Sequence, residues 1–384
     1  MGTRRLKAVL GLALAAGCGP KIDPLTELKA EMAAVRATEP QATVVLDDAA
    51  LTDMAAELLG RPYTAPGPLG MAVVVLPDIE RAAVRVLGTD GDVTVDLEVD
   101  GIVDIAFPLA SQDDLAFEGH LQAPVLASVR PDPSGSWVLL GWTPGQEVGA
   151  EVALPGAPEQ LEALTSGLVQ GALSGALAEP QGALIPNTPW GPITNVTLGA
   201  RDDDLLAFVT VAGAPGVRAE PVSPPPGGFA VVLGEESVLG LLKGLAATGQ
   251  EAETYVVEPL SVSFTEELVH AELRVHKRAR RERWRRYRVT GPLVWQAGSL
   301  RLDAPTLELV DAQGWRKGLS VAVGEARAVS ALQEGIGGLP TALAQPLTAD
   351  LALHIEVSDV HAADGQLVVS GPVEVVARQK PPLP

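Results

Sequence analysis

The chain has 384 residues, of which 47% are hydrophobic and only 4% aromatic, and its formal net charge at pH 7 is −20. This length allows two or three domains that each bury a core, and the charge argues against nucleic acid as a partner of the folded body. No internal apolar run approaches the roughly 18 residues that a transmembrane helix needs.

The N-terminus carries the strongest single signal in the sequence. Residues 1–17 join a basic start, with Arg4 and Arg5, to an apolar stretch that ends just before Cys18. This pattern resembles a bacterial lipoprotein signal, although Ala15 stands where the usual motif has Leu. The resemblance implies that Cys18 is lipidated and that the protein is lipid-anchored in the bacterial cell envelope, at the outer membrane and facing the periplasm. The alternative is a plain secretory signal in which the cysteine is incidental.

Residues 18–40 form the expected anchor segment. Pro24–Ala37 has apolar residues at helical spacing, which predicts a short helix. Only about five residues separate this helix from Cys18, so the folded body should lie close to the membrane.

A short unit then occurs twice in the sequence. Thr43–Gly60 reads TVVLDDAALTDMAAELLG and Ala230–Ala247 reads AVVLGEESVLGLLKGLAA. Each unit is an apolar strand, an acidic helix start and a short Leu-rich helix, and each is followed by long strands, a longer helix and closing strands. The repetition predicts a duplicated domain. The expected domains are 41–214 and 229–378, joined by a Pro/Gly linker at 215–228 and followed by a tail at 379–384.

The first copy contains the clearest strand pattern. Apolar and polar residues alternate from Val93 to Phe107, and Leu115–Arg130 repeats the pattern. Alternation with a period of two predicts strands with one dry and one wet face. Gly101, inside the first strand, is expected to mark a bend or a bulge. The dry face of this meander needs a cover.

The predicted cover is a helix at Pro158–Ala178, in which glycine recurs at every fourth position. One interpretation is a helix that lies close against a curved sheet, and the other is a groove that the glycines leave open for a ligand. In the second copy, a strand at Leu319–Val323 precedes the counterpart helix Val329–Thr348, which Pro340 interrupts. The candidate ligand-lining residues of the first helix are Leu161, Leu164, Gly167, Leu168, Gly171 and Gly175.

One segment departs from the acidic character of the chain. His276–Arg288 (HKRARRERWRRYR) holds eight Lys or Arg against one Glu, and flanking strands at Val269–Val275 and Val289–Gln296 predict that it forms a hairpin tip. Three interpretations are a solvated tip, contact of the cations, Trp284 and Tyr287 with anionic lipid headgroups or lipopolysaccharide, and nucleic-acid binding. The candidate anionic-surface residues are Lys277, Arg278, Arg280, Arg281, Arg283, Arg285, Arg286 and Arg288.

No motif for catalysis stands out. The five histidines do not cluster, and HExxH, GxSxG, P-loop and GxGxxG patterns are missing. A lone cysteine rules out a disulfide framework and a Cys-based zinc site. The sequence therefore predicts a protein that is not an enzyme and that uses no metal and no cofactor.

The order of strand, short helix, long meander, long helix and closing strands, used twice, resembles the TULIP superfamily of tubular lipid-binding proteins. The resemblance implies an α+β fold of two tandem copies, each a highly curved antiparallel sheet wrapped around a long helix. It also implies a periplasmic lipoprotein that binds or carries a lipid or other hydrophobic ligand without catalysis. The alternative is a structural or assembly lipoprotein with packed, ligand-free domains. A lipid carrier needs an apolar cavity on the order of several hundred Å³. The volume of the interior cavity therefore distinguishes a lipid carrier from a packed, structural lipoprotein.

Overall fold

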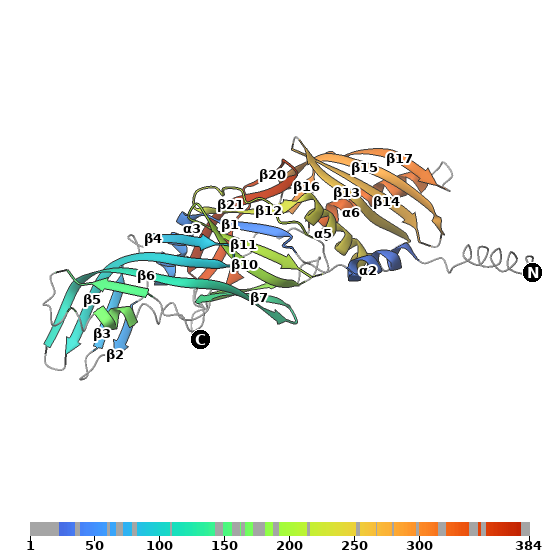
Figure 1. Cartoon of the computed structure of the whole chain (residues 1–384). Coiled ribbons are helices and arrows are strands. Elements are labelled where there is room, and N and C mark those ends of the chain that lie inside the picture. Colours follow the sequence, from blue (N-terminus) through green and yellow to red (C-terminus); the bar gives the residue numbers. More distant parts are fainter. Residues whose placement is uncertain are drawn as a thin grey trace, which may run out of the picture.

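The computed structural model describes most of the chain between Asp23 and Ala377 (Figure 1). The described residues are 23–34, 39–59, 62–66, 72–78, 83–107, 110–142, 149–155, 162, 166–171, 181–186, 192–212, 216–250, 254–265, 267–278, 280–296, 299–313, 320–337, 345–346 and 351–377. Within them, three antiparallel sheets form a central sheet with a curled sheet on either side. Cys18, the predicted signal peptide 1–17 and the predicted tail 379–384 lie outside the described residues.

The central sheet joins the two copies. Its strands, in spatial order, are β10 (Ile193–Arg201), β11 (Asp204–Val211), β1 (Ala42–Leu46), β12 (Gly228–Gly234), β21 (Gln366–Ala377), β19 (Leu351–Ile355) and β18 (Gln345–Pro346), and β20 (Asp359–Ala363) also pairs with β21. In its middle, β1 and β12 run antiparallel, with Thr43 opposite Val232 and Leu46 opposite Phe229. These are the strands of the two repeated units, and each leads into its helix, α3 (Asp48–Leu59) or α5 (Glu235–Gly249). The sequence repeat is therefore arranged head to head across one strand pair.

The hairpins that flank this pair are also equivalent. β10–β11 turns at Asp202 and Asp203, with φ of 52° and 72°, and β20–β21 turns at Asp364 and Gly365, with φ of 50° and 76°. Two successive positive φ values are typical of the two-residue turn that matches the twist of an antiparallel hairpin. The acidic residues at the first turn therefore have a backbone role, because Asp tolerates this conformation better than most residues.

The first curled sheet contains the long alternating strands. Its strand order is β2 (Tyr63–Pro66), β3 (Ala72–Pro77), β5 (Asp92–Phe107), β6 (Ala110–Asp132), β7 (Gly135–Trp142) and β9 (Gln181–Pro186), with β4 (Ala83–Thr89) on β5 and β8 (Gly149–Ala153) on β6. The predicted strand over Val93–Phe107 is confirmed. Its register shift lies between Val103 and Ile105 and not at Gly101, where a Cβ would lie 2.5 Å from the Phe117 ring. The same Cβ would lie even closer to the Leu76 carbonyl oxygen, so Gly101 is a point of close approach to a neighbouring backbone and to an aromatic side chain.

The second curled sheet has the same plan with fewer strands. β13 (Tyr255–Thr265), β14 (Leu268–Lys277), β15 (Arg280–Gln296) and β16 (Ser299–Leu302) follow in order, and β17 (Thr306–Gln313) also pairs with β15. Helices α5 and α6 (Ser320–Gly337) pack against one face of this sheet, which we call the inner face. The predicted fold class is confirmed as an α+β chain with two strongly curled antiparallel sheets (Figure 1).

The boundaries predicted for the long helix of the second copy are wrong. Residues 320–323, expected as the end of a strand, open α6, and residues 345–346, expected as helix, form β18. The physical reason is a four-residue spacing that begins early, because Gly324, Ala328, Leu332 and Ile336 are all buried.

Helix α2 (Pro24–Ala34), next to the expected anchor, packs on the second copy. Leu28 and Met32 share a small apolar cluster with Ala246 and Ala247 of α5. Two ion pairs accompany this contact: Glu31 with Lys243 at 2.7 Å, and Asp23 with Arg278 at 2.8 Å. The first described helix of the chain therefore packs on the second copy, although the first copy follows it directly in the sequence.

The predicted linker is held against the central sheet in its described part, 216–228. The backbone of Val217 exchanges hydrogen bonds with the Ser237 hydroxyl of α5, each 3.2 Å long. Ala219 is buried, and its carbonyl accepts a 3.0 Å hydrogen bond from the Thr43 hydroxyl of β1. The segment thus ties the first strand of one copy to the first helix of the other.

The two copies also share a hydrophobic cluster. Val45, Leu206 and Phe208 come from the first copy, and Ala230, Val232 and Val368 come from the second. Since neither copy can bury these side chains alone, the free energy of unfolding of each copy should depend on the other.

We therefore expect Phe208→Ala to reduce amide hydrogen-exchange protection in β5 and in β14 alike. Truncating a buried Phe costs about 3–5 kcal/mol of unfolding free energy. The matched variant Phe117→Ala lies in a core that only the first copy builds, and it should affect β14 less. Full protection of β14 in Phe208→Ala would show that the copies unfold independently.

Candidate hydrophobic ligand site

The basic segment contains the turn of the β14–β15 hairpin, but most of it lies along β15, so the prediction that the whole segment forms the tip is wrong. β14 ends at Lys277 and β15 starts at Arg280, while β17 pairs with β15 from Trp284 to Thr290. Most of the segment is therefore in the middle of a sheet. Its alternation sends some arginines outward and one, Arg285, onto the inner face, where only 3% of its surface is exposed.

The outward arginines are neutralised by carboxylates of neighbouring strands. Arg286 and Arg288 both contact Glu272 at 2.9 Å, and Arg288 also contacts Glu308 at 3.2 Å. Arg278 at the turn is paired with Asp23. These pairs are nonlocal in sequence, which is why the charge run alone gave no sign of them.

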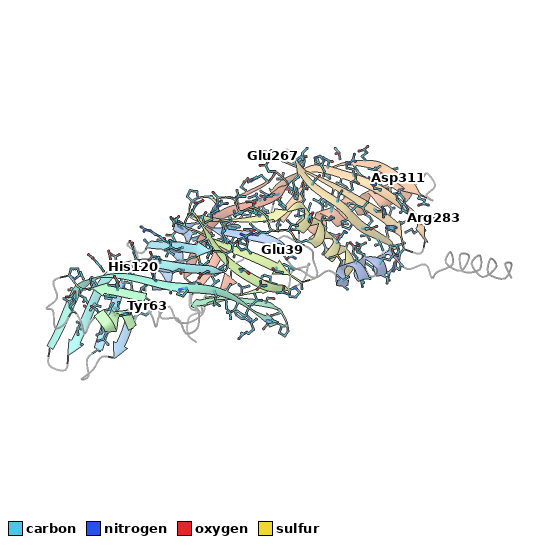
Figure 2. The ribbon with its side chains drawn as sticks, viewed as in Figure 1. Glu39, Tyr63, His120, Glu267, Arg283 and Asp311 are labelled. Carbon is cyan, nitrogen blue, oxygen red and sulfur yellow. The ribbon has the colours of Figure 1, made fainter. Side chains whose placement is uncertain are left out.

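Two predicted cations of this segment, Lys277 and Arg283, form no ion pair within the part of the chain that the structure describes. They lie towards the end of the second copy that adjoins α2, and Figure 2 labels Arg283 there. The side chains of Arg280 and Arg281 lie outside the described residues. The structure therefore leaves a smaller cationic surface than the sequence predicts.

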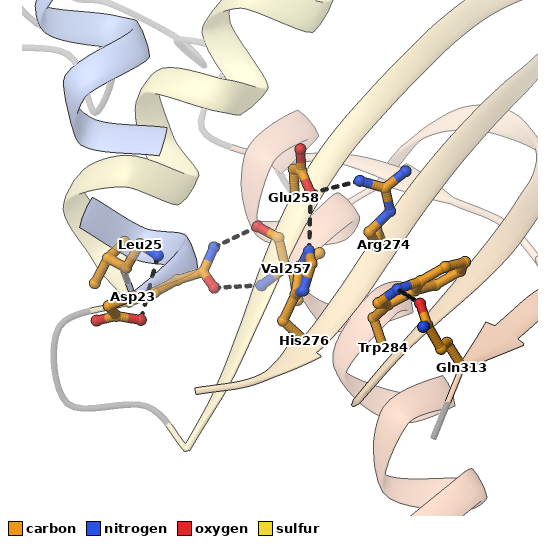
Figure 3. Close-up of polar contacts among 9 residues, drawn as sticks. Asp23, Leu25, Val257, Glu258, Arg274, His276, Trp284 and Gln313 are labelled. Carbon is orange, nitrogen blue, oxygen red and sulfur yellow. Dashed lines mark hydrogen bonds and ion pairs between the residues drawn. The ribbon is translucent and has the colours of Figure 1, made fainter. Parts of the chain in front are cut away.

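The outer face near this end carries a polar cluster (Figure 3). The Glu258 carboxylate contacts His276 Nε2 at 2.9 Å and Arg274 Nη1 at 3.4 Å. Burial would raise the pKa of Glu258, but the His276 hydrogen bond and the charge of Arg274 outweigh it and lower that pKa. Trp284, predicted as an interfacial aromatic, donates its Nε1–H to Gln313 at 2.8 Å. These groups stabilise cross-strand pairing.

The inner face of the second copy encloses the candidate ligand site. The site lies where α5, α6 and the sheet meet, and every side chain that lines it is apolar. The space left among them is about 20 Å³. The lining residues are Val238, Leu241 and Leu242 of α5, Leu332 and Ile336 of α6, Val262, Phe264, Val269 and Leu293 of β13–β15, and Leu367 of β21.

The sequence of α6 explains why the space lies towards its C-terminal end. The residues that α6 turns towards the sheet grow in size along the helix, from Gly324 and Ala328 to Leu332 and Ile336. A Cβ on Gly324 would lie 2.8 Å from the Tyr287 hydroxyl, so only glycine lets the helix come this close to the sheet. At Leu332 and Ile336 bulkier side chains face α5 and the sheet, and the gap among them remains.

In the first copy, the two described glycines of the row lie on the side of the helix away from the sheet. Gly167 and Gly171 are exposed, and a Cβ built on either meets nothing within 4 Å. Val169 is the fully buried residue of this stretch, and Leu168 packs beside it on the sheet core. Leu161, Leu164 and Gly175 lie outside the described residues. The helix therefore turns its other face to the sheet, and the ligand-lining call for this set of residues stays a prediction.

Other chemistry is sparse in the described part of the chain. No three His, Cys, Asp or Glu side chains gather there as a metal site would require. None of the helices in these ranges is both long and apolar enough to cross a membrane.

Comparisons with known proteins give only remote likenesses. No family model and no curated protein matches the sequence. Among solved structures, P47 from Clostridium botulinum A2 aligns with a TM-score of 0.40 and 11% identity, over 87% of this chain and 97% of that one. P47 of Clostridium botulinum E1 gives 0.41 and 8%, over 87% and 99%. A lipopolysaccharide binding protein gives 0.34 and 10%, over 88% and 99%. Likenesses at this level carry no argument about ligand or function.

The orientation of the first-copy helix predicts that substitutions at two nearby residues change the free energy of unfolding in opposite directions. Gly167→Ala, on the exposed side, should raise the free energy of unfolding by about 0.5–1 kcal/mol, because alanine favours the helix. Val169→Ala, on the buried side, should lower it by about 1–3 kcal/mol. Urea unfolding of the two variants measures both effects. A larger loss for Gly167→Ala than for Val169→Ala would mean that the glycines face the sheet.

Proposed function

We propose that this chain is a lipid-anchored protein of the bacterial cell envelope that binds a lipid or another hydrophobic molecule without catalysis. The observation that carries the proposal is the wholly apolar lining of the site between α5, α6 and the inner face. Such a site offers no polar group to a reacting molecule, but it matches an acyl chain, whose transfer from water is favourable in proportion to the apolar area buried.

Ligand entry requires α6 to move away from the sheet. The space measures about 20 Å³. Pockets that hold a drug-sized ligand are far larger, on the order of several hundred Å³. The buried residues that α6 turns to the sheet, Ala328, Leu332 and Ile336, are apolar. Their contacts are non-directional, so the helix can shift along or away from the sheet without breaking geometrically strict bonds.

The small space also favours a second candidate function. A fully packed domain would serve as a structural or assembly part of the envelope and would bind nothing in its interior. The two functions differ in what the protein carries when it is purified, and in how the site responds when a lining side chain is removed.

Enlarging the site should strengthen binding if the first function holds. We expect Leu332→Ala to increase uptake of a fluorescent long-chain fatty acid, although the variant loses about 2–5 kcal/mol of unfolding free energy. The control Leu121→Ala removes an equally buried leucine from the first-copy core and should leave uptake unchanged. Mass spectrometry of organic extracts should find an apolar molecule in the wild-type protein. Empty extracts together with unchanged uptake by Leu332→Ala would favour the packed, structural function.

The anchor forms the second part of the proposal. A lipid on Cys18 would hold the chain at the membrane, about five residues from Asp23. Because Asp23 is paired with Arg278 and α2 packs on α5, the second copy would lie nearest the membrane. Lys277 and Arg283, at the same end, would then meet anionic lipid headgroups, a contact worth about 1 kcal/mol per cation near the surface. Nucleic acid is not an expected partner.

Cell fractionation tests the anchor. We expect Cys18→Ser to move the protein from the membrane pellet to the soluble periplasmic fraction, since its lipid is lost. Any residual pelleting should fall with added salt and with Lys277→Ser/Arg283→Ser, but not with the matched pair Arg85→Ser/Arg130→Ser in the first copy. Salt-resistant pelleting of Cys18→Ser would contradict an anchor at this cysteine.

A further inference from the structure

The inner face of β15 changes from polar to apolar along its length. Arg285 and Tyr287 come first, followed by Val289, Gly291 and Leu293, and all five are buried. Arg285 and Tyr287 are 3% and 0% exposed. A charged group and a phenol deep in an otherwise apolar interior are costly to bury, so their position calls for a physical explanation.

The hydroxyl of Tyr287 has no hydrogen-bond partner within the described residues. Burial raises the pKa of Tyr287, and the charge of Glu325 on α6 adds to the rise. Arg285 opposes the rise in this pKa, because its guanidinium lies close to the hydroxyl and can only donate to the phenol oxygen. The phenol O–H thus remains a donor without an acceptor in a dry interior, where an acceptor would remove the cost of leaving it unsatisfied.

This polar pair and the apolar site lie at opposite ends of one helix–sheet interface. Along β15, Tyr287 and Leu293 are six residues apart, or about 20 Å. Along α6, Gly324 lies over Tyr287, and Ile336 lines the apolar site. Twelve residues of helix span about 18 Å. The two lengths agree, so the distance along α6 from the hydroxyl to the apolar site is that of a long acyl chain.

Exposed apolar side chains adjoin the polar end. Leu309 of β17 is directly opposite Tyr287 in the strand register and is 47% exposed. Residues paired in this way point to the same face of a sheet. Val323, which precedes Gly324 on α6, is 45% exposed. Apolar side chains are therefore exposed at this end of the interface, on β17 and at the start of α6.

We propose that Tyr287 and Arg285 receive the anionic head group of a single-chain amphiphile whose chain extends along α6 to the apolar site. The inference rests on the proposed function and adds the chemical class of the ligand. A phenol O–H and a guanidinium both donate hydrogen bonds, and a guanidinium matches the planar or tetrahedral oxygens of a carboxylate or phosphate. When α6 moves away from the sheet, the chain lies along the helix, and the head group stays at the end where Leu309 and Val323 are exposed.

The test compares an acid with its neutral counterpart. Affinities of the full chain are measured for a long-chain fatty acid, for its methyl ester and for the lysophosphatidic acid of the same chain. Tyr287→Phe removes only the hydroxyl and keeps the ring that packs under Gly324. We expect it to weaken binding of the two anions roughly tenfold or more, the effect of one hydrogen bond to a charged group, and to leave the ester unchanged. Tyr63→Phe, in the first copy, is the matched control and should change none of the three affinities.

Two further variants test the charge. Glu325→Gln removes the carboxylate near Tyr287 and should strengthen binding of both anions but not of the ester. Arg285→Lys keeps the charge and loses the fork of donors, so it should weaken anion binding while the protein stays folded. Whichever anion binds more tightly to the wild-type protein identifies the head group.

The outcomes separate this inference from the proposed function. If no amphiphile binds the wild-type protein, acid or ester, then the proposed function fails. If the ester binds as tightly as the acids, or if Tyr287→Phe and Glu325→Gln change none of the affinities, then a hydrophobic site stands and the anionic head-group site is overturned.

Discussion

The pairing of β1 with β12 is the constraint on which the rest of the structure depends. Each strand leads into the helix that closes one copy, and each is flanked by the closing hairpin of its own copy. The buried residues Val45 and Val232 contribute to one cluster across the pair. A β-strand edge exposes unpaired donors and acceptors, and here each copy satisfies the edge of the other. The pairing thus covers two strand edges at once and joins the two curled sheets through one central sheet.

Much of the architecture follows from local sequence patterns. The repeated strand–helix unit and the alternation over Val93–Phe107 predict the duplication and the long strands, because both depend on short-range periodicity. The boundary of α6 and the face that Gly167 presents were missed. A helix that carries small residues on one face and apolar residues on another gives no sign of which face the sheet takes. That choice depends on the volume left by strands distant in sequence, such as the one that carries Tyr287.

The candidate site was predictable only in kind. The sequence indicates an apolar interior between helix and sheet, but it placed the candidate lining residues in the first copy, and the described apolar site lies in the second. The position of the basic segment was also predicted wrongly. Eight of its thirteen residues are Lys or Arg, and so many cations hide the alternation that would identify a strand. Glu272 and Glu308 neutralise its outer arginines from neighbouring strands, and such pairs cannot be read from spacing along one strand. The hidden alternation is what turns Arg285 and Tyr287 inward.

That inward turn bears on the choice between a ligand site and a packed domain. A domain selected only for packing gains from apolar residues at both positions, since replacing a buried ionic group by hydrophobic ones is often neutral or stabilising. Phe in place of Tyr287 would also fill the same space beneath Gly324 without an unsatisfied hydroxyl. A buried hydroxyl without a partner costs stability, and stability is commonly sacrificed at functional sites. The chain places these groups at one end of an interface whose other end is wholly apolar, and this is the order of polar and apolar parts in an amphiphile.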